Sequence, residues 1–247
     1  GTGDTYVDGM VLKDISSQTS EEYYTKYNNR MRVWQEPHPQ YSYIISCDTS
    51  LGRDRDYSAF HIINLYNGQQ VGEFYSNKTA INDFAQIIAN EGMLYNIAHV
   101  ICERNTIGNN LIDWLYNIYE YENLWSDEKG DIGFQVTAKN RDSILADMEE
   151  ALRTDLIKIN STRTCDELMT FIITEGGKAQ AERNHHDDLI MSLALAVYGY
   201  KHLLDTTPIE FVSKIPHKDT PLMPSRNYKA NLKDAYGRMT QEDYKWL

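Results

Sequence analysis

The chain has 247 residues, of which 24 are Lys or Arg and 36 are Asp or Glu, so its formal net charge at pH 7 is −12. This length can bury one good-sized core with extensions or two small domains, and no apolar run of about 18 residues is present that could cross a membrane. Three scattered cysteines are too few for a disulfide framework or a zinc site, which favours a reducing compartment. The negative charge opposes binding to nucleic acid, but it is compatible with a local basic rim around an acidic cleft.

The first 40 residues are expected to form an entry segment that precedes the main domain. Residues 1–15 are compatible with a short strand or hairpin, and the polar stretch that follows allows a helix to start at Ser20. Pro37 and Pro39 would stop such a helix, so residues 35–40 are interpreted as a short linker.

Three strands are predicted directly after this linker. Tyr43–Asp48 is an apolar run that ends in an acid, as expected for a buried strand. Ser58–Leu65 and Gln70–Ser76 follow, and they flank the dipeptide Asn67-Gly68, which is typical of a tight hairpin. The simplest arrangement makes the three strands antiparallel neighbours.

The rest of the chain is predicted to alternate between helices and short strands. Apolar residues at positions 81, 84, 85, 87 and 88 indicate a helix. The other predicted elements are strands at His99–Glu103, Gly133–Val136 and Leu156–Ile159, helices within Leu111–Tyr121, Ala138–Thr154 and His186–Leu203, a core-packing segment at Asp166–Ile173, and a hairpin turn at Glu175–Lys178. From Asp205 onward no periodicity is sustained, so this tail is expected to be extended or mobile.

Acidic residues stand at the ends of three of these apolar elements. Asp48 and Glu103 each follow a cysteine at the end of a predicted strand, and Asp187 and Asp188 stand at the start of the last helix. Because side chains alternate across a strand, the two cysteines are expected on one face and the two strand acids on the other. If these strands are neighbours, the acids converge and repel one another, which a divalent metal ion such as Mg²⁺ or Mn²⁺ would relieve.

Each acid also has an ordinary structural explanation. Asp48 could simply start a turn, and Glu103 could pair with Arg104 or with a lysine. Asp187 could cap the last helix, since an acid near a helix start accepts backbone N–H bonds and suits the helix dipole. Asp56, in the loop after the first strand, is an uncertain further candidate.

Several basic and polar residues are candidates for contacts to phosphate, although each is also compatible with a solvated surface role. His185 and His186 lack the further partners that a zinc site needs, so one of them positions a phosphate or a water, or both belong to a plain polar loop. The candidates for these phosphate contacts are Arg104, Asn105, Lys139, Arg141, Arg183 and His186. No recognition-helix motif is present, so base-specific readout is not expected.

The chain resembles a known family, the nuclease domain of the large terminase subunit of tailed bacteriophages, particularly of the T-even-like type. Five segments carry the resemblance in the family's order. They are DTSLGRDRDYSAFHII, ERNTIGNNL, TAKNRDSILADMEEAL, LIKIN and NHHDDLIMSLALA, and together they span most of residues 41–200.

The resemblance implies an α/β, ribonuclease H-like fold, with a mixed five-stranded sheet whose first three strands are antiparallel and with helices on both faces. It implies residues 1–40 as an entry segment from the end of an ATPase domain, 41–204 as the nuclease domain and 205–247 as the tail. The family's three acids fall on Asp48, Glu103 and Asp188, which are the expected catalytic residues and metal ligands. Asp187 and Asp56 are expected as further metal ligands.

The implied activity is that of an endonuclease that cuts concatemeric viral double-stranded DNA when genome packaging starts and finishes. It would hydrolyse phosphodiesters with two ions of Mg²⁺ or Mn²⁺. The implied partners are DNA, the ATPase domain of the same protein, the portal or procapsid and the small terminase subunit, in the host bacterial cytoplasm and with no membrane. Two alternatives stay open, namely another ribonuclease H-like nuclease of the Holliday-junction resolvase or transposase type, and a module that mainly docks DNA or the portal.

Overall fold

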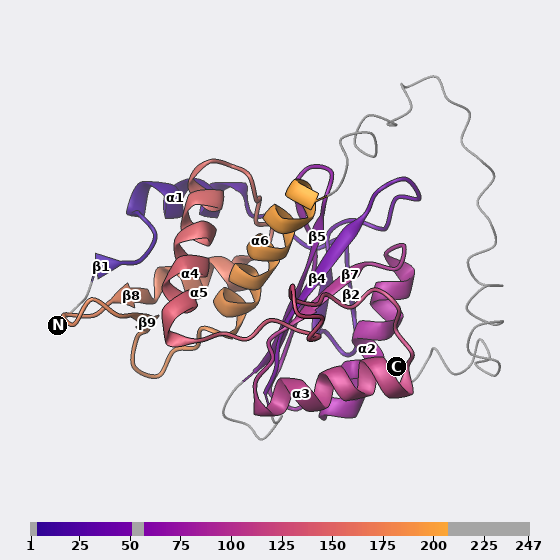
Figure 1. Cartoon of the computed structure of the whole chain (residues 1–247). Helices are drawn as coiled ribbons and strands as arrows, with labels where there is room; N and C mark the ends of the chain where they lie inside the picture. Colours follow the sequence, from indigo (N-terminus) through magenta and orange to yellow (C-terminus); the bar gives the residue numbers. More distant parts are fainter. Residues whose placement is uncertain (1–3, 51–56, 207–247) are drawn as a thin grey trace.

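The computed structural model describes residues 4–50 and 57–206. These residues form two β-sheets and the helices that pack on them (Figure 1). The strands are β1 Asp4–Thr5, β2 Tyr24–Lys26, β3 Met31–Val33, β4 Tyr43–Asp48, β5 Ser58–Asn64, β6 Gln70–Ser76, β7 His99–Cys102, β8 Phe171–Ile173 and β9 Ala179–Ala181. The main sheet has the order β2-β3-β6-β5-β4-β7, and the small sheet has the order β1-β8-β9.

The three central strands confirm the arrangement that the sequence predicts. β5 pairs antiparallel with both β4 and β6, and β7 is parallel to β4. The turn between β5 and β6 contains Gly68 with a positive φ of 70°. A side chain there would also collide with the neighbouring backbone, because a Cβ would lie 1.9 Å from the Leu156 carbonyl oxygen.

The main sheet has six strands instead of the five expected, because its edge comes from the N-terminal segment. β2 and β3 form a hairpin there, and β3 pairs with β6, so the helix expected from Ser20 is absent from the described residues. The strand or hairpin expected in residues 1–15 is mostly helix α1, Gly9–Gln18. Asp8 caps this helix by accepting a hydrogen bond from the Met10 N–H, and the helix buries only a narrow apolar stripe.

Two of the predicted strands are reduced to isolated bridges. In the predicted strand at 133–136, Phe134 forms a parallel bridge with Glu103, and in the one at 156–159, Lys158 forms a parallel bridge with Gln69. The hairpin predicted around 175–178 is confirmed as the β8–β9 pair, with Gly177 at a φ of 76° in its turn.

Helices cover both faces of the main sheet, as expected. They are α2 Ile81–Leu94, α3 Thr106–Asp113 (continued by a π-helical turn, η1 Trp114–Ile118), α4 Ala138–Arg153, α5 Thr162–Met169 and α6 Asp188–Thr206. One apolar core contains residues of α1, α4, α5 and α6, and the other contains residues of α2 and α3 (Figure 1). Among the described residues, no helix is both long and apolar enough to cross a membrane.

Helix α6 is the element that packs most directly on the centre of the sheet. Gly199 permits this approach, since a Cβ at that position would lie 2.3 Å from Ile44 Cδ1. Further along the same face of β4, the Ser192 hydroxyl donates to the Ser46 carbonyl oxygen at 2.8 Å. The spacing of these contacts aligns the start of α6 with the C-terminal end of β4.

Candidate functional site

Two of the predicted acids stand at the C-terminal ends of the parallel strands β4 and β7. Cys47 and Cys102 are register partners, and both are buried in the core on the α2 and α3 side. The ladder continues by one hydrogen bond, from the Glu103 N–H to the Cys47 carbonyl oxygen at 3.1 Å. Asp48 and Glu103 therefore follow equivalent positions on adjacent strands, as the alternation of side chains predicts.

Asp188 comes to the same place from the other end of the chain, as the first residue of α6. Asp188 lies one turn before Ser192 in α6, and Ser192 contacts Ser46, two residues before Asp48. The side chain of Asp188 is 15% exposed. The negative charge of Asp188 also contributes to raising the pKa of Asp48. The structure thus brings together Asp48, Glu103 and Asp188, from three distant segments of the chain.

The three carboxyl groups perturb one another strongly. The pKa of Asp48 is raised well above its ordinary value by burial first, and then by the negative charges of Glu103 and Asp188. The pKa of Glu103 is also raised by burial, although hydrogen bonds from Asp48 and Asn105 and the charge of Arg141 act in the opposite direction. Each ionised carboxylate in this cluster therefore costs free energy in the absence of a cation.

The chemistry of this donor set fits a hard divalent cation. Carboxylate oxygens are the ligands that Mg²⁺ and Mn²⁺ prefer, and a bound cation would remove the repulsion that raises these pKa values. Across residues 4–50 and 57–206, however, no three His, Cys, Asp or Glu side chains are grouped closely enough to hold a metal ion as they stand. The three acids are thus neighbours that are not closed into a ligand set, and Asp56 lies outside the described residues.

Asp187 is engaged differently from Asp188. Its carboxylate oxygen Oδ2 lies 3.2 Å from Nη2 of Arg141, a residue of α4 whose Nη1 also donates to the Ala179 carbonyl oxygen at 2.8 Å. The Asp187 carbonyl oxygen accepts from the Met191 N–H at 2.8 Å, so its main chain starts α6. This geometry favours Asp188 over Asp187 as the acid beside Asp48.

The segment after β7 packs against the backbone of Glu103. Asn105 is the N-cap of α3, and its side-chain oxygen accepts from the N–H groups of Ile107 at 3.0 Å and Gly108 at 2.7 Å. Gly108 packs so tightly that a Cβ would lie 1.8 Å from the Glu103 carbonyl oxygen. Asn105 and Gly108 thus hold the backbone at Glu103 in place.

The predicted basic residues fall into two groups. Arg104 pairs with Asp127 at 3.3 Å and with Asp131 at 3.0 Å, so its guanidinium is turned to that loop and not to Glu103. Lys139, in the first turn of α4, and Arg183, in the loop before α6, are both exposed.

The two histidines before α6 differ in their surroundings. Nδ1 of His186 lies 3.6 Å from Oδ2 of Asp188, and its ring meets the ring of Tyr57 edge-on at 4.9 Å. His185 is exposed, and its N–H donates to the Glu182 carbonyl oxygen at 3.0 Å. His186 is therefore the histidine that lies beside the carboxylates.

A fourth acid near the site, Glu167 of α5, is absent from the sequence predictions. Its side chain is 9% exposed, and Oε2 accepts from the Leu189 N–H in the first turn of α6 at 3.0 Å. Its pKa is raised to about 8, chiefly by burial and further by the charge of Asp188. The sequence feature that could have revealed Glu167 is its place on the buried face of a short amphipathic helix, together with Cys165 and Leu168.

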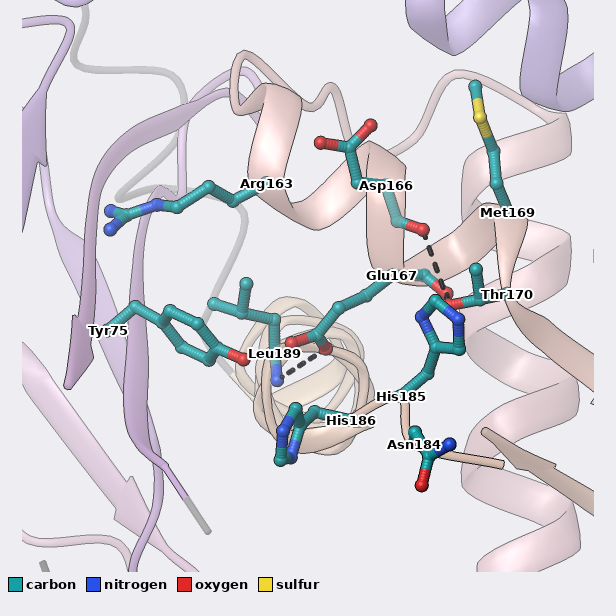
Figure 2. Close-up of a pocket in the computed structure, with 10 residues that line it drawn as sticks. All are labelled: Tyr75, Arg163, Asp166, Glu167, Met169, Thr170, Asn184, His185, His186 and Leu189. Atoms are coloured by element: carbon teal, nitrogen blue, oxygen red, sulfur yellow. Dashed lines mark hydrogen bonds between the residues drawn. The ribbon is translucent and has the colours of Figure 1, made fainter. Parts of the chain in front are cut away.

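Glu167 lies at the floor of a pocket of about 450 Å³ beside the start of α6. Figure 2 shows its carboxyl group beside the Leu189 backbone nitrogen, with the Tyr75 hydroxyl and the ring of His186 close by. The pocket is lined by Tyr75, Arg163, Asp166, Glu167, Met169, Thr170, Asn184, His185, His186 and Leu189. It therefore adjoins the carboxylate cluster through the residues on either side of Asp188.

No protein-family model matches the chain, but solved structures do. The large terminase nuclease from thermophilic phage G20c with bound magnesium is 18% identical, with a TM-score of 0.63 over 80% of this chain and 98% of that chain. The same nuclease with bound cobalt is 19% identical, with the same TM-score and coverage. The large terminase nuclease domain of Thermus phage P74-26 is 20% identical, with a TM-score of 0.61 over 77% of this chain and 95% of that chain.

The TM-scores of 0.61–0.63 indicate a common fold, and at identities of 18–20% the likeness is limited to the fold. The neighbours are nuclease domains of large terminases, as the resemblance predicted, whereas the T-even-like subtype stays a prediction. The α/β architecture with a mixed, mostly antiparallel sheet agrees with theirs. The chain therefore has the ribonuclease H-like fold of the large terminase nuclease domains.

Proposed function

We propose that this chain is the nuclease domain of a phage large terminase, a metal-dependent endonuclease that cuts concatemeric viral double-stranded DNA when packaging begins and ends. The observation that carries the proposal is the convergence of Asp48, Glu103 and Asp188 at the C-terminal ends of β4 and β7. The common fold with metal-bound terminase nucleases supports it. The proposed partners are DNA, an ATPase domain of the same protein, the portal or procapsid and the small subunit, in the host cytoplasm.

In this proposal the three acids bind two ions of Mg²⁺ or Mn²⁺. Asp48, whose pKa is raised by the charges of both Glu103 and Asp188, would hold the cations together with these two acids. When bound, the cations supply Lewis-acid activation of water and stabilise the leaving oxygen of a phosphodiester. Asp187 and Asp56 are proposed as further metal ligands, Asp56 directly or through a water.

The chain's own residues then orient the acids and the substrate. Arg141 pairs with Asp187, and its positive charge opposes the burial that raises the pKa of Glu103. His186 lies beside Asp188, where it can position a phosphate or a water. Lys139 and Arg183 are exposed and are proposed to contact the DNA backbone, which carries no sequence information.

The proposal is tested by replacing the acids one at a time. Asp48→Ala and Glu103→Ala are each expected to abolish Mn²⁺-dependent nicking of plasmid DNA and to retain the wild-type circular dichroism spectrum. Asp83→Ala, which removes an exposed acid from α2, is the matched control and is expected to cut normally. Cutting by a purified Asp48→Ala protein would refute the assignment, and a preference for branched over linear duplex would favour a resolvase instead.

A further inference from the structure

The start of α6 lacks the usual local cap. The first N–H groups of a helix need acceptors, and the side chain of the N-cap residue normally bonds the N–H two or three residues on. Asp187 is the N-cap, because its carbonyl oxygen accepts from the Met191 N–H. Its carboxylate is drawn instead to Arg141, at 3.2 Å.

Glu167 supplies the missing acceptor from another helix. The Leu189 N–H, at the second helical position, donates to Oε2 of Glu167 at 3.0 Å. The other oxygen, Oε1, is buried and has no partner at hydrogen-bond distance among the described residues, while the nearby Tyr75 hydroxyl interacts with the carboxyl group. An acid buried in this way costs free energy that an apolar packing residue would not.

The same residue of α6 is also held from the opposite side. The Leu189 carbonyl oxygen lies 2.9 Å from Nε2 of His61 on β5. The amide oxygen of Gln70 accepts from the N–H groups of Asn160 and Ser161, so the Gln70 nitrogen must be the atom that faces His61 Nδ1 at 2.8 Å. His61 therefore accepts at Nδ1 and donates through Nε2, and the main chain of Leu189 is fixed between α5 and the sheet.

We propose that Glu167 is a positioning residue that, by accepting the Leu189 N–H, holds Asp188 in place against Asp48. Asp188 directly precedes Leu189, so a shift of this turn would move its carboxylate away from the other two acids. The proposal rests on the proposed function, because holding Asp188 in place matters only if Asp188 binds a cation. Glu167 itself is not proposed as a ligand.

The experiment compares Glu167→Leu with Glu167→Gln in the full chain. Leucine fills a similar volume but has no acceptor, whereas the glutamine oxygen can still accept from the Leu189 N–H. Asp166→Ala is the matched control, since Asp166 is an exposed acid on the same helix and at the same pocket. We would measure calorimetric affinity for Mn²⁺ alone, kcat and KM for plasmid nicking, and hydrogen exchange at the Leu189 amide.

Glu167→Leu is expected to weaken Mn²⁺ binding by about 10–100-fold, as for other residues that orient metal ligands. It should lower kcat with little change in KM for DNA and should speed exchange at Leu189. The Mn²⁺ affinity and kcat of Glu167→Gln should stay within about threefold of the wild-type values, since only the acceptor matters in this proposal. Those of Asp166→Ala should equal the wild-type values.

Wild-type Mn²⁺ affinity and kcat in Glu167→Leu would overturn the proposal, as would an equal loss in Glu167→Gln. If Glu167→Leu does not fold, the Glu167→Gln variant decides alone, because a loss of Mn²⁺ affinity of about tenfold or more in Glu167→Gln would overturn the proposal. Failure of the proposed function is distinguished by Asp48→Ala. If that variant binds Mn²⁺ and nicks DNA like wild type, the function is wrong, whereas exchange at Leu189 still reports whether Glu167 holds the turn.

Discussion

Replacing Gly108 with alanine tests how closely the backbone packing behind Glu103 controls the site. Gly108 lies in the first turn of α3, and a Cβ there would lie 1.8 Å from the Glu103 carbonyl oxygen and 3.0 Å from its carbonyl carbon. Real Cβ atoms do not approach closer than 3.0 Å, so α3 and the Glu103 backbone must separate by at least about 1.2 Å. The obstacle is backbone, so no side-chain rotation relieves it.

Two opposing terms set the size of the effect. Alanine gains about 1 kcal/mol over glycine in a helix, whereas overpacking a tight site costs about 1–3 kcal/mol and sometimes more. With a backbone atom as the obstacle the upper end applies, so we expect a net loss of about 2 kcal/mol, or roughly 4–8 °C in Tm for a domain of this size. Catalysis should fall further, because a displacement of about 1 Å at a reacting group can cost about 100-fold.

The assay combines thermal unfolding with Mn²⁺-dependent plasmid nicking, measured well below the lower Tm so that both proteins are folded. Gly9→Ala is the control, because Gly9 begins α1 and a Cβ there has no neighbour within 4 Å. It should leave Tm and nicking almost unchanged. A Gly108→Ala protein with wild-type Tm and wild-type nicking would show that Glu103 is not held by this contact.

Three further predictions concern stability. The pKa of Glu167 is raised to about 8, chiefly by burial and then by Asp188 and other neighbours. The folded state therefore binds this proton more tightly than the unfolded state does. The free energy of unfolding thus falls as the pH rises from about 4.5 to about 8. At pH 7 this amounts to on the order of 3 kcal/mol, so Glu167→Gln should be more stable than wild type in urea with EDTA at pH 8, with little difference at pH 4.5; an equal difference at both pH values would contradict this. Ser192→Ala should lose about 1–3 kcal/mol because it leaves buried polar groups of Ser46 without a partner, and an unchanged Tm would count against that contact. Mn²⁺ at about 100 times its Kd should add about 2.7 kcal/mol to wild type and nothing to Asp48→Ala, so equal stabilisation of both would argue against this site.

The elements that the sequence predicted well are those whose signal is local. The strands β4 and β6 have the predicted bounds, because an apolar run and a hairpin turn at Gly68 mark them in the sequence itself. Helix α1 was missed because its buried stripe consists of only Leu12 and Ile15, and its clearest mark is the cap at Asp8. The strands β2 and β3 have three residues each, and they exist because the distant strand β6 offers an edge to pair with.

The candidate site divides in the same way. Asp48, Glu103 and Asp188 were recognisable because each is an acid at the end of an apolar element, but their approach depends on the pairing of β4 with β7 and on the packing of α6. Sequence spacing does not encode those contacts. Arg104 illustrates the limit, because its partners, Asp127 and Asp131, lie in a loop whose path no periodicity predicts.

The order of the three acids along the chain has a consequence for biosynthesis. Asp48 and Glu103 are joined by the β4–β7 pairing, but Asp188 belongs to α6, the last described helix, which closes over β4 through Ser192. Domains form as the chain emerges from the ribosome, N-terminal parts first. On the proposed function, a nascent or truncated chain that lacks α6 carries two of the acids and cannot complete the cation site, so hydrolytic activity appears only once the domain has been fully synthesised and folded.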